Sequence, residues 1–205
     1  MVQAQNIIIG ITGTISAGKA ALRYFLVDRG FKSIRLTRPI FEEGLKRKID
    51  LSNRENWINL DIELRKKNGM NFLAKKATKR IKEKERYVIC PIRHPTDIKY
   101  LKDNYNALII FVDAPFKTRF KRTFLKELGG GLTEKEFKSK DDCENNPEGK
   151  DKKYSSNISA CKKLSDEIII NNKSLNYLNQ QLEKILRKYK IPDLVDTTTY
   201  EDFDM

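Results

Sequence analysis

Residues 6–20 of this chain read Asn6-Ile7-Ile8-Ile9-Gly10-Ile11-Thr12-Gly13-Thr14-Ile15-Ser16-Ala17-Gly18-Lys19-Ala20. The first seven residues are an apolar, β-branched run of strand length. The rest is a turn that is bounded by two glycines and ends in a lysine where a helical pattern begins. Because strand, turn and helix follow in this order, the stretch predicts a phosphate-binding P-loop. The alternative is a tight strand-to-helix turn that binds nothing.

Each part of such a loop has a physical role in holding a phosphate chain. Gly13 and Gly18 let backbone N–H groups approach closely, the amino end of the next helix attracts negative charge, and Lys19 is a mobile cation. We therefore expect Lys19 to act in catalysis as well as in binding. The nucleotide-binding residues expected in the loop are Gly13, Thr14, Ser16, Ala17, Gly18, Lys19 and Ala20.

The expected magnesium site departs from the usual pattern at two positions. A P-loop normally follows its lysine with Ser or Thr, whose hydroxyl binds Mg²⁺, but this chain has Ala20. P-loop enzymes also hold the metal through an acid after a strand like the third one here, where this chain has Cys90. We expect no metal ligand from the protein, so Mg²⁺ would be held mainly by nucleotide oxygens and water. Asp113, after the fourth strand, is either a helix-start residue or a metal partner.

Composition favours a polyanionic partner. The 205 residues suffice for one domain with a full core, or a domain with a small insertion, and 41 Lys and Arg against 28 Asp and Glu give a net charge of +13. No run approaches the length of a membrane span, and the three cysteines lack metal-ligand spacing. We expect a cytoplasmic protein with free thiols, no membrane partner and no histidine-based metal centre.

Strand-like and helix-like segments alternate along the chain. Strands are expected at 6–12, 33–37, 87–90, 106–113 and 166–170, with helices between them, including a lysine-rich one over about 71–86. This order predicts an α/β fold of the P-loop NTPase type, with a doubly wound parallel sheet of about five strands and a helical lid. We expect one domain over 1–189, with the lid inserted at about 115–160, and an acidic tail over 190–205.

Basic residues are expected where the strands end, because ligands bind at that edge of such sheets. Arg119 and Arg122 lie three apart on the helix that follows Pro115, next to the hinge-like run 129–131, and we expect them to stabilise a transferred phosphoryl group. A merely solubilising helix face is the alternative. Arg38, after the second strand, and Arg54 and Arg65, in the helices before the third, are candidate acceptor-binding residues, with surface arginine as the alternative. His94 is expected to have a structural or substrate-contacting role.

Four segments together resemble nucleoside monophosphate kinase-like P-loop proteins: GITGTISAGKA at the start, VICPIRHPTDIKYL at 88–101, IIFVDAPFKTRFKRT at 109–123 and EIIINNKSLNYLNQQLEKIL at 167–186. The resemblance covers residues 6 to about 187. It points to the dephospho-coenzyme A kinase and deoxynucleoside monophosphate kinase branch, and to the P-loop domain that precedes the catalytic domain of some deoxycytidylate deaminases. It implies that Arg93 contacts the acceptor, that Arg119 and Arg122 contact the transferred phosphate, and that Asn171 and Asn172 lie near the adenine.

Three functions are compatible with these patterns. The first is an ATP-dependent kinase that transfers the γ-phosphoryl group to a nucleotide or nucleotide-like acceptor, either a nucleoside monophosphate or dephospho-coenzyme A. The second is a nucleotide-binding domain that has lost catalysis and regulates a partner protein such as a deaminase. The third is a basic nucleic-acid-binding protein. It ranks last because the aromatic residues are not interleaved with charge in any recognisable module.

Overall fold

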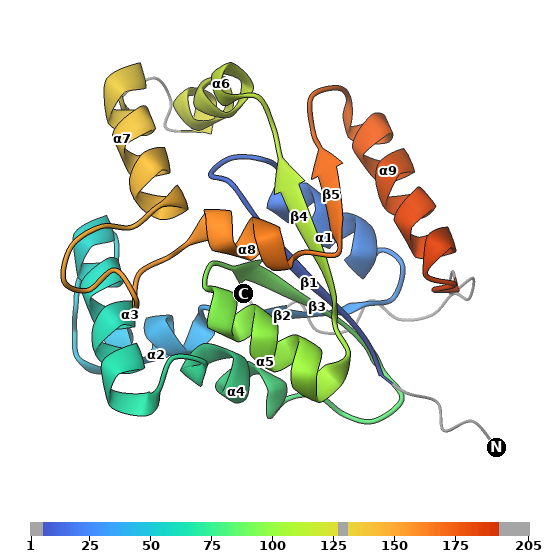
Figure 1. The fold of residues 1–205 in the computed structure, drawn as a ribbon, viewed down its shortest axis with the longest axis horizontal. Helices are drawn as coiled ribbons and strands as arrows, with labels where there is room; N and C mark the ends of the chain where they lie inside the picture. Colours follow the sequence, from blue (N-terminus) through green and yellow to red (C-terminus); the bar gives the residue numbers. More distant parts are fainter. Residues whose placement is uncertain (1–5, 127–130, 193–205) are drawn as a thin grey trace.

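The computed structural model of the chain describes residues 6–126 and 131–192. Within them five strands form one sheet in the order β2-β3-β1-β4-β5, and every neighbouring pair is parallel. Figure 1 shows this sheet at the centre of the molecule with helices on both sides. The predicted doubly wound parallel sheet is confirmed. The strands are β1 (Ile7–Gly13), β2 (Lys32–Arg35), β3 (Arg86–Ile92), β4 (Leu108–Asp113) and β5 (Glu167–Ile170).

The central strand is buried on both faces because its side chains alternate between two hydrophobic cores. Ile8 belongs to the core beneath α4 (Phe72–Thr78), α5 (Pro95–Tyr105) and α8 (Ile158–Leu164). Ile9 and Ile11 belong to the core beneath α1 (Lys19–Val27) and α9 (Leu175–Lys188). This explains why the strand reads as a continuous apolar run and does not alternate with polar residues.

The register of the sheet brings three strand ends to one level. Thr12 pairs with Ile92 of β3 and with Phe111 of β4, and the next residue, Gly13, pairs with Val112. The loops after β1, β3 and β4 therefore start side by side. Figure 1 shows α6 (Phe116–Lys126) and α7 (Glu134–Asn145) beyond this edge, while α2 (Arg38–Lys46) and α3 (Arg54–Asn68) flank the β2 side.

The lysine-rich helix is shorter than predicted. It was expected to continue to about residue 86, but α4 ends at Thr78. The Thr78 hydroxyl bonds back to the carbonyls of Ala74 and Lys75, and Lys84 has a φ of 62°, which a right-handed helix does not contain. The remaining lysines therefore lie in the turn that leads into β3.

Two predicted features lie partly or wholly outside the described residues. Of the predicted hinge 129–131 only Gly131 is described, and the acidic tail is described only as far as Pro192. Among the described residues, no helix has the length and apolar character that crossing a membrane would require.

Candidate functional site

The loop after β1 requires glycine at both of its ends. Gly13 has a φ of 138° and Gly18 a φ of 109°, both in the left-handed half of backbone space. A Cβ on Gly13 would lie 2.0 Å from the Val112 carbonyl oxygen, and one on Gly18 would lie 2.2 Å from Asn171 Nδ2. The loop therefore packs too tightly against its neighbours for any side chain at these two positions.

Lys19 starts α1 and folds back across the loop. Its Nζ donates to the carbonyl oxygens of Gly13, at 2.8 Å, and Thr14, at 2.6 Å. The first turn of α1 has no acidic residue, and no side chain caps its amino end. The positive end of the helix dipole and the ammonium group thus face the same space, an arrangement that attracts an anion.

Helix α6 lies against the loop and brings both predicted lid arginines to it. Nη1 of Arg119 is 3.4 Å from the Ile15 carbonyl oxygen, and Nη1 of Arg122 is 3.3 Å from that of Ala17. Arg119 also forms two hydrogen bonds, of 2.6 and 2.8 Å, with the carboxylate of Asp141 on α7. Arg119 is therefore buried and charge-paired, whereas Arg122 is partly exposed and its pKa is lowered by partial burial.

The two asparagines after β5 differ in their contacts. Asn171 is 3% exposed, and its Nδ2 donates to the Ala17 carbonyl oxygen at 2.8 Å. The backbone carbonyl oxygen of Asn171 accepts a hydrogen bond from Nη2 of Arg122 at 3.1 Å. Asn172 is exposed. Asn171 therefore holds the loop in position through Ala17, and Asn172 is exposed to solvent.

The residues at the two positions that usually supply Mg²⁺ ligands, Ala20 and Cys90, are unsuited to a hard cation. Ala20 offers a methyl group, and Cys90 is buried, with its pKa raised to about 11 by burial, so it carries a neutral thiol at neutral pH. Asp113, the third candidate, has other partners. Its Oδ1 accepts from the Thr14 hydroxyl at 2.8 Å and from the Ala114 N–H at 2.9 Å. Within the described ranges no group of three acidic, cysteine or histidine side chains could hold a metal ion.

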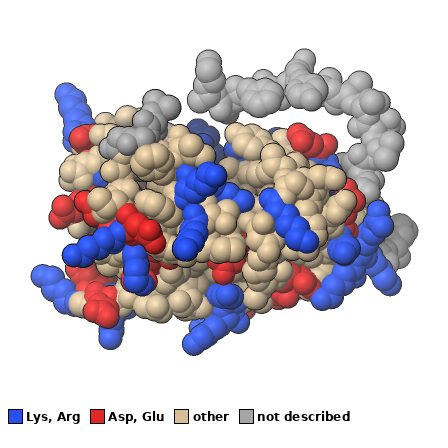
Figure 2. Space-filling model, turned by 90° about the horizontal axis from the view of Figure 1, so that it is seen from above, with Lys and Arg blue, Asp and Glu red and all other residues tan. Residues whose placement is uncertain are grey.

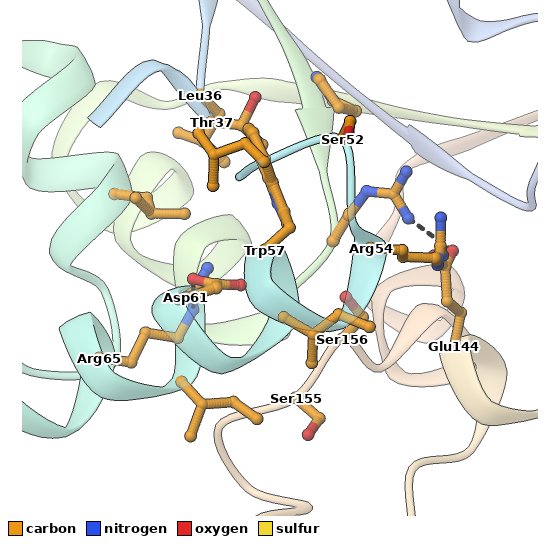
Figure 3. Close-up of a pocket in the computed structure, with 16 residues that line it drawn as sticks. Leu36, Thr37, Ser52, Arg54, Trp57, Asp61, Arg65, Glu144, Ser155 and Ser156 are labelled. Atoms are coloured by element: carbon orange, nitrogen blue, oxygen red, sulfur yellow. Dashed lines mark hydrogen bonds and ion pairs between the residues drawn. The ribbon is translucent and has the colours of Figure 1, made fainter. Parts of the chain in front are cut away.

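A cavity of about 340 Å³ opens between α3, the end of β3 and the end of α7. Figure 3 shows Trp57, Asp61 and Arg65 on α3, with Arg54 at the start of this helix directed toward Glu144 of α7. Both Arg54 and Arg93 donate to the Glu144 carboxylate, the latter at 2.5 Å. Two of the predicted acceptor-binding arginines thus meet in one cavity.

The other two candidate arginines are placed differently. Arg65 borders the cavity, but it is 2% exposed and its guanidinium is held by Asp61, by Asp97 and by the Met70 carbonyl oxygen. Arg38 is exposed and pairs with Glu42 one turn along α2. It is not among the residues that line the cavity. Arg65 is thus held by structural ion pairs and hydrogen bonds, and Arg38 lies on the surface.

His94 caps α5 and ties down the segment that leads to α8. Its Nδ1 accepts from the Thr96 N–H at 3.2 Å, and its Nε2 lies 2.8 Å from the Lys153 carbonyl oxygen. Burial, reinforced by the charge of Arg65, lowers the pKa of His94 to about 4. The imidazole is therefore neutral at pH 7 and has the structural role that was one of the two expected.

The sequence analysis missed four residues that shape the site, namely Trp57, Asp97, Asp141 and Glu144. The two acids of α7 lie three apart in a helix where charged residues are abundant, so nothing in the sequence distinguished them. Asp97 has a weak signal, because it is an acid in the first turn of a helix that starts with Pro95. Its partner Arg65 is 32 residues away.

Positive charge also predominates outside the site. Figure 2 shows more basic than acidic side chains on the face seen from above, with acidic groups between them. Many basic groups of the described residues are paired, as in Lys32 with Glu85 and Lys102 with Asp166. The excess of positive charge is thus partly compensated by ion pairs among the described residues.

Comparison with known proteins identifies relatives and the fold. A UPF0200 protein from Thermococcus kodakarensis is 30% identical over 122 residues, which are 56% of this chain and 65% of that protein, just under two thirds of its length. A UPF0200 protein from Sulfurisphaera tokodaii is 25% identical over 181 residues, 88% of this chain and 96% of that protein. No protein-family model matches the chain.

Among solved structures, shikimate kinase from Acinetobacter baumannii in complex with shikimate superposes with a TM-score of 0.57 over 92% of this chain and 97% of that chain, at 12% identity. At this identity the likeness concerns the fold. Together with the strand order and the loop after β1, it shows an α/β fold of the P-loop kinase type.

Proposed function

We propose that this chain is a P-loop kinase-like domain that binds ATP at residues 13–20 and transfers the γ-phosphoryl group to a nucleotide or nucleotide-like acceptor. The observation that carries the proposal is the position of Lys19. Its ammonium group lies across a glycine-bounded loop at the amino end of α1, and Arg54 and Arg93 converge in a cavity at the end of β3, a strand that pairs with β1.

The residues would divide the work of phosphoryl transfer as follows. The loop and Lys19 hold the donor phosphates, and Asn171 keeps the loop in place while Asn172 lies where the adenine is expected. An oxygen of the acceptor attacks the γ-phosphorus, the bond from that phosphorus to the bridging oxygen of ADP breaks, and ADP leaves with the electron pair. Negative charge spreads over the equatorial oxygens, where Lys19 and Arg122 would stabilise it. Arg119 would act more indirectly, because Asp141 already neutralises it.

The proposed domain covers residues 1–189, with α6 and α7 as the lid over the carboxyl edge of the sheet. The relatives named UPF0200 protein give no activity to transfer, and the kinase name of the structural neighbour supports the proposal only through the shared fold. A cytoplasmic location and a nucleotide substrate follow from the proposed chemistry. They stay predictions.

A coupled assay of ADP release tests this function. ATP is offered with deoxynucleoside monophosphates, ribonucleoside monophosphates or dephospho-coenzyme A, each with and without magnesium. We expect turnover that depends on one class of acceptor and is lost in the Lys19→Met variant. Acceptor-independent ATP hydrolysis alone, or no turnover with any acceptor, would contradict the kinase proposal.

The alternative is a nucleotide-binding domain without catalysis that regulates a partner such as a deaminase. Ala20 and Cys90 favour it, because both positions lack the oxygen ligands of the usual metal site. The Ala20→Ser/Cys90→Asp double variant separates the two functions. Activity that appears only in the double variant supports the regulatory function, whereas turnover by the unmodified chain refutes it.

A further inference from the structure

Glu144 has both carboxylate oxygens engaged by arginines from two different elements. Arg54, at the start of α3, donates to Oε1, and Arg93, just after β3, donates to Oε2 at 2.5 Å. Glu144 itself is 8% exposed. One carboxylate therefore bridges two guanidinium groups that both line the cavity, and Figure 3 shows Arg54 directed toward Glu144.

This ion-paired group differs from the two buried pairs nearby. Arg65 and Asp97 are 2% and 0% exposed at their side chains, and Arg119 and Asp141 are 7% and 8% exposed. By contrast, the side chains of Arg54 and Arg93 are 44% and 31% exposed and line the 340 Å³ cavity. The arginines that hold Glu144 can therefore be reached by a ligand, while those of the two closed pairs cannot.

Two guanidinium groups share the single carboxylate of Glu144. Asp61, which also lines the cavity and whose charge acts on Arg93, is paired with Arg65. Partial burial and, to a lesser extent, the nearby charge of Arg54 lower the pKa of Arg93 to about 10. A phosphate monoester carries up to two negative charges and offers three acceptor oxygens, so it would satisfy both guanidiniums better than a single carboxylate does.

Glu144 is also poorly placed for its own helix. It lies in the last turn of α7, which has no basic residue, so its charge meets the negative end of the helix dipole. The anchors of α7 lie elsewhere: Phe137 packs against Phe116 and Phe120, and Asp141 pairs with Arg119. Release of Glu144 therefore leaves these anchors in place and relieves an unfavourable interaction within the helix.

We infer that Glu144 is an internal stand-in for the phosphate of the acceptor, and that a nucleoside monophosphate enters the cavity by displacing it from Arg54 and Arg93. This inference rests on the proposed function, because it names the acceptor class of the same site. The rest of the cavity suits the ring of such a ligand. Its wall combines the indole of Trp57 with aliphatic side chains, and serine hydroxyls lie on the α7 side.

Glu144 thereby sets the selectivity of the site. A ligand must displace a carboxylate that two arginines already hold, so a weakly charged or single-carboxylate ligand gains little. A dianionic phosphate ester gains two charge-assisted hydrogen-bonding partners, and its oxygens can serve both guanidinium groups at once. Removing the charge of Glu144 should strengthen the binding of every anion that uses the arginine pair.

The test uses the fluorescence of Trp57, because the chain contains a single tryptophan and it lines this cavity. AMP, inorganic phosphate, adenosine and acetate are titrated separately into the full chain, the Glu144→Gln variant and the Glu134→Gln variant. The last is the matched control, with the same change at an exposed residue of the first turn of α7. Circular dichroism checks that each variant is folded.

We expect Glu144→Gln to strengthen the binding of AMP and of inorganic phosphate about tenfold or more, because the ligand no longer competes with a carboxylate for two charge-assisted hydrogen bonds. Adenosine should be unaffected, and Glu134→Gln should behave like the unmodified chain. Unchanged or weaker AMP binding in Glu144→Gln would overturn the inference, as would acetate binding more tightly than phosphate.

A second variant keeps this test separate from the proposed function. Lys19→Met should leave the AMP-induced change of Trp57 fluorescence intact, because Lys19 does not line the cavity. If AMP binds and Glu144→Gln tightens it, but no phosphoryl transfer occurs, the inference stands and the kinase proposal fails. If transfer to a nucleoside monophosphate occurs and Glu144→Gln does not tighten it, only the inference fails.

Discussion

Substituting Asp97 by Ala should destabilise the fold strongly, because it removes one partner of a buried ion pair. Asp97 accepts from Arg65 at 2.8 Å and from the Ala74 N–H at 3.2 Å, and its side chain is fully buried. Breaking a buried pair costs about 3–5 kcal/mol, since the remaining charge stays in a poorly solvating environment. Arg65 keeps a second carboxylate, Asp61, at 2.9 Å, so we expect the lower end, about 3 kcal/mol.

Urea denaturation at pH 7, followed by Trp57 fluorescence, measures this cost. A loss of about 3 kcal/mol corresponds to a melting temperature lower by roughly 6–12 °C for a domain of this size. Asp142→Ala is the matched control, because Asp142 pairs with Lys138 on the surface with both side chains more than 60% exposed, and such pairs contribute at most about 0.5 kcal/mol. If Asp97→Ala were no more destabilising than Asp142→Ala, the assignment of Arg65 to a structural ion pair would be wrong, and Arg65 would be available to a ligand.

Three further predictions concern the cap of α5, the loop after β1 and the thiols. The pKa of His94 is about 4 in the folded chain and about 6.5 in the unfolded chain, so the unfolded chain binds the extra proton first and the free energy of unfolding should fall by about 2–3 kcal/mol as pH drops from 6.5 to 4. The His94→Asn variant, which can still cap the helix, should show a smaller fall in its urea midpoint over the same pH range. An equal fall in the variant would contradict the role of His94 in this pH dependence. Gly18→Ala should weaken ATP binding, measured by calorimetry, at least about tenfold, because its Cβ would lie 2.2 Å from a side-chain nitrogen. Gly149→Ala, whose Cβ would have nothing within 4 Å, should leave ATP affinity unchanged, and equal affinities of the two variants would show that the loop tolerates a side chain. Mass spectrometry after brief alkylation at pH 8 should find exposed Cys143 modified well before buried Cys90, whose pKa is about 11, and the reverse order would refute its burial.

The sequence predicted the sheet because its signals are local. The run 7–11 is apolar on both faces, which only a central parallel strand requires, and Ser174 caps α9 as expected from its side chain. The length of α4 was not predictable in the same way. Its lysine stripe continues past Thr78 at helical spacing, but the chain leaves the helix after Thr78, whose hydroxyl bonds back to the Ala74 carbonyl, and reaches a positive φ at Lys84.

The loop after β1 and the two arginines of the cavity were candidates from the sequence, whereas Glu144 and the pairings across the cavity were not. Residues 13–20 are contiguous, so their spacing alone indicates the loop. The cavity is built from pairs far apart in sequence: Arg54 and Glu144 are 90 residues apart, and Arg93 and Glu144 are 51 apart. Arg65 illustrates the opposite error. Its position in the sequence does not tell whether an arginine pairs with a buried acid or binds a ligand.

Nucleotide binding by this chain requires Lys19 to bind the phosphates, and calorimetric titration of ATP and ADP into the Lys19→Met variant tests this most directly. Lys32→Met, at a solvent-exposed lysine of β2 that pairs with Glu85, is the control. We predict that Lys19→Met lowers the affinity for both nucleotides at least about tenfold, the loss expected when a charged hydrogen-bonding group is removed, while Lys32→Met leaves it unchanged. Equal affinity of the Lys19→Met variant and the unmodified chain would contradict the assignment of this loop as a phosphate-binding site.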